Sequence, residues 1–168
     1  MKRTALVLAF AALALGAAAP AVAAVTVLEE DFEGQGYKQK WTFAPEAAWS
    51  QMAQGTNHYM AFEGKNGGTA TSNKEIRVNA SEQYKITFRY RRGPATVKWG
   101  PYVLGQVAAA TTWQRASFAK LTQKQERLKF QISVPNTTAR FDFDDVLIVR
   151  CETAVGPASL GRIRALFR

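Results

Sequence analysis

Cysteine and histidine are almost absent from the 168-residue sequence, which contains one of each. Because Cys151 has no second cysteine to pair with, the chain can form no internal disulfide. Because His58 is the sole histidine, a histidine-rich metal site is excluded, and a Ser-His-Asp arrangement would have to use this one residue. A partly buried free thiol at a strand end is expected for Cys151. The fold must therefore be stabilised by packing, helped at most by a bound metal.

Motifs that would indicate catalysis or nucleic-acid binding are also missing. A glycosidase needs two converging carboxylates, and no spacing singles out a pair among Glu33, Glu46, Glu63, Asp142 and Glu152. The sequence has no phosphate-binding glycine loop and no nucleic-acid motif. We therefore expect no enzyme activity and no nucleic-acid partner. A small polysaccharide hydrolase or lyase remains an alternative.

Residues 1–23 have the three parts of a secretory signal peptide. A basic start, Met1-Lys2-Arg3, precedes an apolar stretch over residues 5–19, and Ala21-Val22-Ala23 fits the small-residue cleavage rule. The alternative, a membrane anchor, needs roughly 20 apolar residues. We expect cleavage after Ala23 or one residue later, and a bacterial protein that is secreted, periplasmic or on the cell surface, without a transmembrane anchor.

Basic residues outnumber acidic ones by 22 to 13, which gives a formal net charge of +9. With Lys2 and Arg3 removed, the basic residues fall to 20 and the net charge to +7. Such a charge fits an anionic partner, for example a polysaccharide or a cell wall. It also fits a domain that is simply kept soluble by its charge, so both readings stay open.

Short runs of alternating apolar and polar residues fill the chain from Val25 onward. In the clearest run, Tyr84, Ile86, Phe88 and Tyr90 share one face. The pattern predicts strands over residues 25–32, 40–43, 48–52, 58–63, 84–90, 96–99, 113–121, 127–134 and 140–149. Each of these strands has one apolar face, which predicts an all-β fold, a two-sheet antiparallel β-sandwich over residues 24–152.

The composition changes after residue 152. Residues 153–159 form a small-residue linker, and residues 160–168 form a short basic-apolar C-terminal tail. On a helix this tail would be amphipathic, but nine residues are too few for a stable isolated helix. A frayed terminus and a docking or sorting tag are both open, and the tail or Cys151 could support self-association.

Four segments resemble one known group of folds. They are Asp31-Phe32-Glu33-Gly34 with the following Trp41, residues 58–62, residues 84–90, and residues 139–148, which contain Phe141-Asp142-Phe143-Asp144-Asp145-Val146. In this order and spacing they resemble the jelly-roll carbohydrate-binding modules of the galactose-binding-like superfamily, over residues 27–150. The resemblance implies a jelly roll with a non-catalytic, carbohydrate-binding role.

The same resemblance implies a structural calcium ion between the first and last strands. Its ligands would be Glu33 and Asp144, with Asp145 as a further candidate. Calcium prefers six to eight hard oxygen ligands, which carboxylates supply. The alternative is that Asp144 and Asp145 pair with arginine or with backbone N–H groups.

Aromatic rings bind sugars by stacking on the apolar faces of pyranoses. Trp99 and Tyr102 flank the Gly100-Pro101 turn, and Trp49 lies in a polar stretch, so these three rings are predicted to bind carbohydrate, with core packing as the alternative. The resemblance to carbohydrate-binding modules implies that Trp41 and Trp113 lie in the core.

A basic row accompanies these rings. Arg89 and Arg91, with Lys98 on the following strand, are predicted to face away from the core and to meet acidic groups of a glycan. The sequence thus predicts a secreted non-catalytic module that binds a polysaccharide or cell-surface glycan, with an anionic polysaccharide as one such partner. A structural or adhesive protein of the cell envelope is the alternative.

Overall fold

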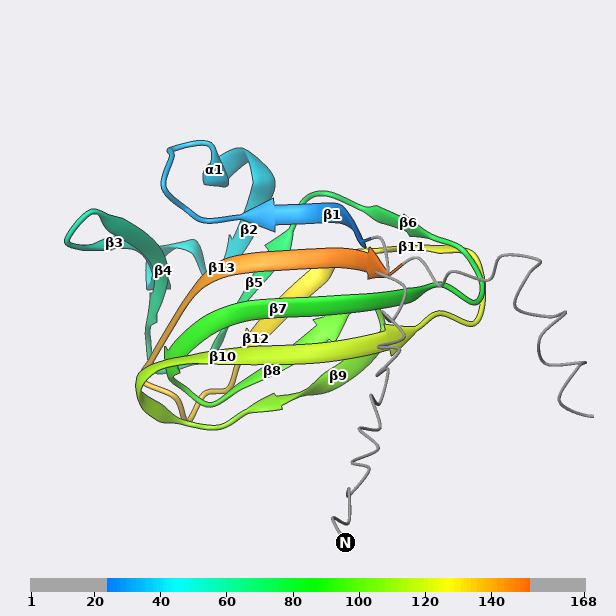
Figure 1. Cartoon of the computed structure of the whole chain (residues 1–168). Helices are drawn as coiled ribbons and strands as arrows, with labels where there is room; N and C mark the ends of the chain where they lie inside the picture. The colour runs from blue at the N-terminus through cyan, green and yellow to red at the C-terminus, as the bar shows by residue number, and fades with distance from the viewer. Residues whose placement is uncertain (1–23, 152–168) are drawn as a thin grey trace, which may run out of the picture.

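The computed structural model describes residues 24–151 (Figure 1). The predicted signal peptide (1–23) and the predicted linker and tail (153–168) lie outside the described residues, so both stay predictions. The described part contains thirteen strands, one helical turn α1 (Tyr37–Lys40) and a 3-10 turn η1 (Glu46–Ala48). The all-β fold predicted from the alternating pattern is confirmed.

Sheet A has six strands in the order β10-β7-β13-β4-β3, and β1 pairs with β13 beside β4. Its strands are β1 (Ala24–Glu30), β3 (Trp49–Gln54), β4 (Asn57–Glu63), β7 (Gln83–Arg92), β10 (Ala110–Leu121) and β13 (Arg140–Cys151). The long strand β13 pairs with β7 along one edge. Along its other edge, residues Arg140 to Phe143 pair with β4, and residues Val146 to Cys151 pair with β1.

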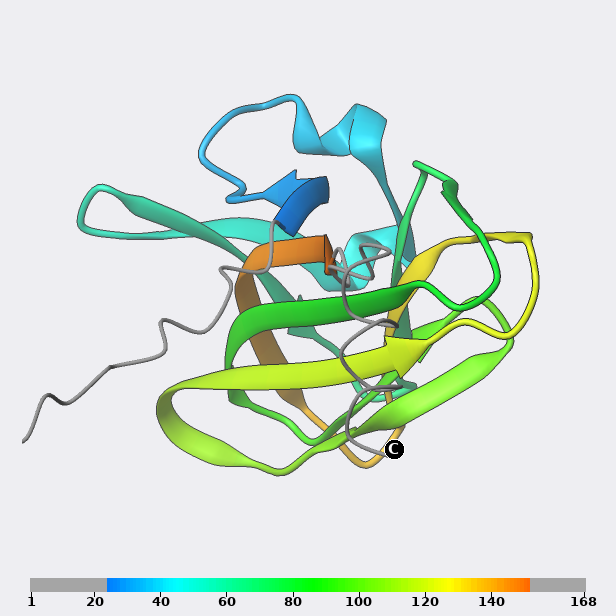
Figure 2. The same ribbon diagram turned by 45° about the vertical axis from the view of Figure 1, so that its right-hand side comes forward.

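Sheet B has five strands in the order β2-β5-β12-β8-β9. Its strands are β2 (Trp41–Ala44), β5 (Gly68–Ser72), β8 (Ala95–Trp99), β9 (Tyr102–Val107) and β12 (Phe130–Val134), while β6 (Ile76–Val78) and β11 (Glu126–Leu128) form a separate two-stranded ribbon. All pairings are antiparallel. The two sheets form the two layers of a sandwich, and the β3–β4 hairpin extends at one end (Figures 1 and 2).

The core lies between the sheets and is rich in aromatic side chains. Phe88 of β7 and Phe130 of β12 come from opposite sheets, and their ring centroids are 6.1 Å apart. Trp41, predicted to be buried, also meets Phe130 at 6.1 Å. Burying each such side chain stabilises the fold by about 1.5–3 kcal/mol. The inward faces predicted from the alternation, Tyr84-Ile86-Phe88 and Phe141-Phe143, are confirmed because each of these residues is at most 1% exposed.

Several strand boundaries differ from the prediction. The predicted strand 127–134 is broken at Lys129, whose carbonyl accepts a hydrogen bond from the Gly100 N–H at 2.8 Å. The first strand ends at Glu30, because Phe32 has a positive φ of 56° that a strand cannot accommodate. Strands β5, β6 and β9 were not predicted, since β5 consists of small polar residues and β9 contains Gly105.

Candidate functional site

Two of the three aromatic residues predicted to bind sugar are buried in the core. Trp99 is 0% exposed, and its ring meets Tyr84 of sheet A at 4.9 Å. Trp49 is 8% exposed and packs against Phe62 at 5.2 Å. The prediction that these rings form a surface platform is wrong, because each belongs to a strand, at the end of β8 and the start of β3, and points inward.

The third predicted ring, Tyr102, is partly exposed but lies on sheet B. Its hydroxyl donates to the Glu126 carboxylate at 2.9 Å, and the Lys120 ammonium lies 3.8 Å from the ring centroid. Lys98 is also on sheet B, in β8, whereas Arg89 and Arg91 are in β7 of sheet A. The prediction that Lys98 lies in one basic row with Arg89 and Arg91 is therefore wrong, because the outer faces of the two sheets are on opposite sides of the sandwich.

Trp113 was predicted to be in the core, and this prediction is wrong. It is partly exposed on β10, an edge strand of sheet A, and contacts Arg89 and Arg91 on the outer face. The inward residues of β10 are Ala116, which is buried, and Phe118, which packs against the core. The alternation of Trp113, Arg115 and Ser117 against Ala116 and Phe118 is the sequence signal that could have placed Trp113 outside.

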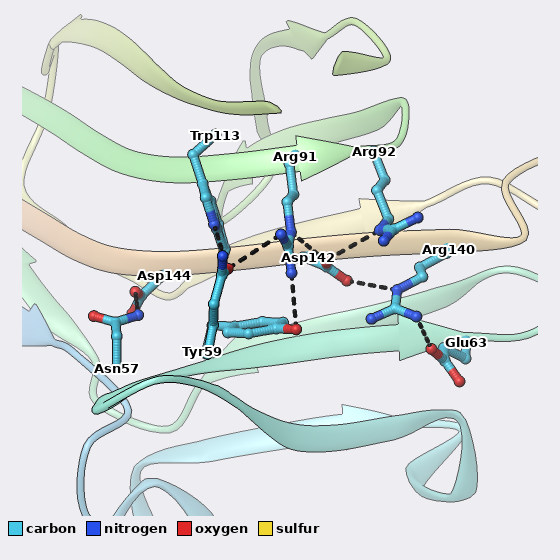
Figure 3. Close-up of polar contacts among 10 residues, drawn as sticks. Asn57, Tyr59, Glu63, Arg91, Arg92, Trp113, Arg140, Asp142 and Asp144 are labelled. Atoms are coloured by element: carbon cyan, nitrogen blue, oxygen red, sulfur yellow. Dashed lines mark hydrogen bonds and ion pairs between the residues drawn. The ribbon is translucent and has the colours of Figure 1, made fainter. Parts of the chain in front are cut away.

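Four side chains on the outer face of sheet A form an aromatic–arginine cluster: Tyr59, Arg89, Arg91 and Trp113. The Arg91 guanidinium lies 4.9 Å from the Tyr59 ring centroid and 4.7 Å from the Trp113 centroid, and Arg89 lies 5.1 Å from Trp113. The Tyr59 and Trp113 rings meet edge to face at 5.3 Å. Figure 3 shows Tyr59, Arg91 and Trp113 converging from three different strands.

Arg91 is held in this cluster by hydrogen bonds on both sides (Figure 3). Its Nε donates to Asp142 Oδ2 at 2.7 Å, its Nη2 to Tyr59 Oη at 2.8 Å, and its Nη1 to Gln54 Oε1 at 3.2 Å. Trp113 Nε1 donates to the same Gln54 oxygen at 3.3 Å. Gln54 therefore ties the β3–β4 hairpin to the edge strand β10, and the indole ring is fixed before any ligand arrives.

The buried carboxylate of Asp142 holds three arginine side chains in place. It is 0% exposed and accepts hydrogen bonds from Nε of Arg91, of Arg92 at 3.3 Å and of Arg140 at 3.1 Å. Arg140 also forms an ion pair with Glu63. A buried carboxylate that lost these partners would be strongly destabilising, so this network keeps the arginines in position.

The three residues predicted to bind calcium have protein partners. Glu33 accepts from the His58 backbone N–H at 2.9 Å and contacts His58 Nδ1 at 2.9 Å, and the side-chain hydrogen bond lowers the pKa of Glu33. Asp145 pairs with Arg89 Nη1 at 3.2 Å. Asp144 is 0% exposed and accepts from Asn57 Nδ2 at 2.8 Å and from the Asp145 N–H at 2.8 Å. Burial raises the pKa of Asp144 to about 6, although both hydrogen bonds lower it.

As these side chains stand, they do not form a group that fits calcium. Glu33 and Asp144 do approach the same end of β4, because they bind the adjacent residues His58 and Asn57. Within residues 24–151, however, no three His, Cys, Asp or Glu side chains converge in a way that could hold a metal ion.

A shallow hollow of about 300 Å³ lies beside the aromatic–arginine cluster, on the same face of sheet A. Arg89 of β7 belongs to both, and Arg115 of β10 lines the hollow next to it. The opposite wall comes from the end of β1 and from the bulge in β13. The lining residues are Glu29, Glu30, Asp31, Thr87, Phe88, Arg89, Arg115, Asp145, Val146 and Leu147. The outer face of sheet A thus offers a fixed aromatic ring, unburied guanidinium groups and a concave surface.

The fold belongs to the class of jelly-roll β-sandwiches found in carbohydrate-binding modules. The CBM22-1–GH10 modules of Clostridium thermocellum endo-1,4-β-D-xylanase 10B share it with a TM-score of 0.59 and 17% identity, over 74% of this chain and 28% of that one. The CBM22-1 domain of Paenibacillus barcinonensis Xyn10C shares it with a TM-score of 0.55 and 17% identity, over 80% of this chain and 99% of that domain.

An adhesin domain has the same fold. The K3 cleaved adhesin domain of Lys-gingipain from Porphyromonas gingivalis has a TM-score of 0.54 and 12% identity, over 76% of this chain and 99% of that domain. No protein-family model matches the sequence, and no curated protein matches it either. Within residues 24–151, no helix has the length and apolar character needed to cross a membrane.

Proposed function

We propose that the protein is an exported, non-catalytic module that binds polysaccharide through the outer face of sheet A. The observation that carries this proposal is the fixed position of Trp113, which is partly exposed and held by Gln54, Tyr59 and two arginines. A ring already locked in place loses little conformational entropy when a sugar stacks on it. Polar groups that surround the ring can hydrogen-bond sugar hydroxyls.

The fold supports this proposal without establishing it, since fold alone does not imply function. The xylanase 10B structure was determined in complex with xylohexaose, and the Xyn10C domain is described as xylan-binding. These two structural neighbours support a polysaccharide as the class of ligand in this proposal. We place the ligand of this chain across the strands of sheet A, near Trp113.

The non-catalytic part of the proposal rests on how the carboxylates are used. Glu63 pairs with Arg140, Glu33 with His58, and Asp142 is enclosed by three arginines. A glycosidase needs one carboxylate as acid and another as base or nucleophile, both open to the substrate. Each of these three carboxylates already pairs with an arginine or with His58. His58 is also the histidine that a Ser-His-Asp triad would have to use.

An adhesive role is the second candidate. It is favoured by the likeness to the adhesin domain of Lys-gingipain and by Val103, which is 62% exposed on the edge strand β9. An exposed edge strand offers unpaired backbone groups to another chain. Size-exclusion chromatography of the wild type and of Val103→Lys tests this role. A monomer at all concentrations, with no change in the variant, would speak against assembly through this edge.

The test of the main proposal is affinity electrophoresis in gels that contain xylan, galactan or mixed-linkage glucan. We expect retardation in at least one gel, and a loss of about tenfold or more in affinity for Trp113→Ala, since a stacked ring contributes on the order of 1–3 kcal/mol. Tyr102→Ala is the matched control, because it removes an aromatic ring from sheet B. Equal binding by wild type and Trp113→Ala, with circular dichroism showing that both are folded, would contradict a binding site at Trp113 on the outer face of sheet A.

A further inference from the structure

We propose that the hollow beside Trp113 binds an acidic sugar residue, whose carboxylate or sulfate group lies between Arg89 and Arg115. This inference rests on the proposed function, because it specifies which polysaccharides the outer face of sheet A selects. It concerns Arg115 and a hollow, neither of which the stacking argument for Trp113 needs.

The two arginines are direct neighbours across two strands. Arg115 of β10 is the Cα partner of Arg89 of β7, and both side chains line the hollow. Like charges placed directly opposite each other in a sheet repel and destabilise it. A bound anion removes this repulsion, and a guanidinium group matches a carboxylate or sulfate with two parallel hydrogen bonds.

Arg115 lacks the internal partner that Arg89 has. Arg89 pairs with Asp145 at 3.2 Å and lies against the Trp113 ring. Arg115 is exposed, and within residues 24–151 its side chain takes part in no ion pair, hydrogen bond or ring contact. Its charge is therefore available to a ligand, whereas Arg91 and Arg92 each pair with Asp142.

The hollow is polarised from one end to the other. Arg115 and Arg89 line the end formed by β10 and β7, while Glu29, Glu30 and Asp31 line the end formed by β1. The four strands β10, β7, β13 and β1 lie side by side, so the two ends are about 14 Å apart at the usual strand spacing. Asp145 of β13 lies between the two ends and pairs with Arg89, so the unpaired guanidinium of Arg115 is the group that favours an anion at the arginine end. The carboxylates at the other end can accept hydrogen bonds from sugar hydroxyls, which gives the sugar a defined direction.

The aromatic ring and the free cation are close enough to act on one sugar residue. Trp113 and Arg115 are two residues apart on the same face of β10, a spacing of roughly 7 Å. Arg89 contacts the indole ring and also reaches into the hollow. A pyranose stacked on Trp113 would therefore present an equatorial carboxylate or a ring sulfate within reach of both guanidinium groups.

The test compares acidic polysaccharides with neutral ones on the whole protein. Polygalacturonate, alginate and hyaluronate carry carboxylates, and heparin also carries sulfates. Carboxyl-reduced polygalacturonate and xylan without uronic acid side groups are neutral, and inorganic polyphosphate is a polyanion without sugar. Dissociation constants are measured at about 0.15 M salt, where long-range attraction between exposed charges is screened beyond about 8 Å. The arms with carboxylate only and with sulfate distinguish the two anionic groups.

We expect at least one acidic polysaccharide to bind at least tenfold more tightly than xylan. If that polysaccharide is polygalacturonate, it should also bind at least tenfold more tightly than carboxyl-reduced polygalacturonate. Arg115→Gln should weaken that binding by about tenfold, the effect expected for loss of one charge-assisted hydrogen bond, and should leave binding to neutral xylan unchanged. Arg127→Gln is the matched control, because it removes the same charge from β11, where Arg127 is exposed and pairs only loosely with Glu75 at 3.8 Å.

Three results would overturn the inference while the proposed function stands. They are equal affinity for acidic and neutral polysaccharides, an equal effect of Arg115→Gln and Arg127→Gln, and binding of polyphosphate as tight as that of any acidic polysaccharide. If no polysaccharide binds at all, the proposed function itself fails. Arg115 is exposed and without internal partners, so its substitution should not affect folding, and a thermal melt of Arg115→Gln checks this.

Discussion

Arg91 covers the ring of Tyr59 and also donates a hydrogen bond to its hydroxyl, with the guanidinium 4.9 Å from the ring centroid and 2.8 Å between Nη2 and Oη. The aromatic ring and the cation therefore stabilise each other's position. Tyr59 is only 3% exposed as a result, although it lies on the outer face of the sheet. Trp113 and Arg89 stay partly exposed on the same face, and Arg115 is exposed beside them.

The carboxylate beneath this surface should be essential for stability. Asp142→Asn removes the negative charge that three arginines share, and we expect a loss of about 3 kcal/mol in the free energy of unfolding. Urea denaturation followed by fluorescence measures this loss. Glu63→Gln is the control, since its ion pair with Arg140 is partly exposed and should contribute less than about 1 kcal/mol. Equal losses would show that Asp142 does not anchor the face.

A second carboxylate should make stability depend on acid pH. Although burial raises it, hydrogen bonds from Tyr84 and from Asn79 and the charge of Arg150 hold the pKa of Glu82 down at about 2. The folded-state pKa is depressed, so this contribution to stability is fully present above about pH 4.5 and is lost as pH falls toward 2. Thermal melts between pH 2 and 6 should show a smaller decline for Glu82→Gln than for the wild type. Parallel declines would contradict this origin.

Calcium remains a proposal from the resemblance, with Glu33 and Asp144 as its ligands and Asp145 beside them. If an ion binds, millimolar calcium should raise the melting temperature, and Asp144→Asn should abolish the shift, because the ion would lose a hard oxygen ligand. The measurement is a thermal melt in calcium and in chelator, with magnesium as the control cation. The same melting temperature in calcium and in chelator would leave Glu33 as a partner of His58 alone.

A glycine should fix the turn that buries Trp99. Gly100 has a φ of +57°, and an added Cβ would lie 2.6 Å from Leu128 Cδ2. We expect Gly100→Ala to cost roughly 1–3 kcal/mol in the free energy of unfolding. Gly36→Ala is the control, because Gly36 has a φ of −65° and no atom within 4 Å of an added Cβ. Urea denaturation of both variants compares them directly, and equal stability would remove the strain argument.

The fold was predictable because apolar residues alternate clearly in β7, β12 and β13, and this alternation identifies the buried face of each strand. The same alternation does not say to which sheet a strand belongs. Arg91 and Lys98 lie only seven positions apart and both face outward, yet the chain crosses from sheet A to sheet B between them. Arg91 and Lys98, which were predicted to lie in one basic row, are therefore on opposite outer faces of the sandwich.

The aromatic residues were misplaced for a related reason. Trp99 stands next to a Gly-Pro turn, and proximity to a turn suggested exposure, but the strand register up to Trp99 keeps its side chain inside. Trp113 was assigned to the core because the resemblance to carbohydrate-binding modules implies a core residue at this position. The alternation along β10, in which Ala116 and Phe118 face inward, places Trp113 on the outer face, and the position of β10 at the edge of sheet A leaves the ring partly exposed.

Strand β13 changes its partner from β4 to β1 between Phe143 and Val146, and Asp145 in this gap has a φ of 51°. Its pairing with β7 is irregular between Asp144 and Leu147. The hollow lies at this irregularity, because Asp145, Val146 and Leu147 line it, and Arg89, the Cα partner of Asp144, belongs both to the hollow and to the aromatic–arginine cluster. The main chain of one strand therefore shapes the wall of the hollow that faces Arg89 and Arg115. Substitution of the side chains that line the hollow would therefore change its charge more than its shape, because the bulge in the main chain of β13 would remain.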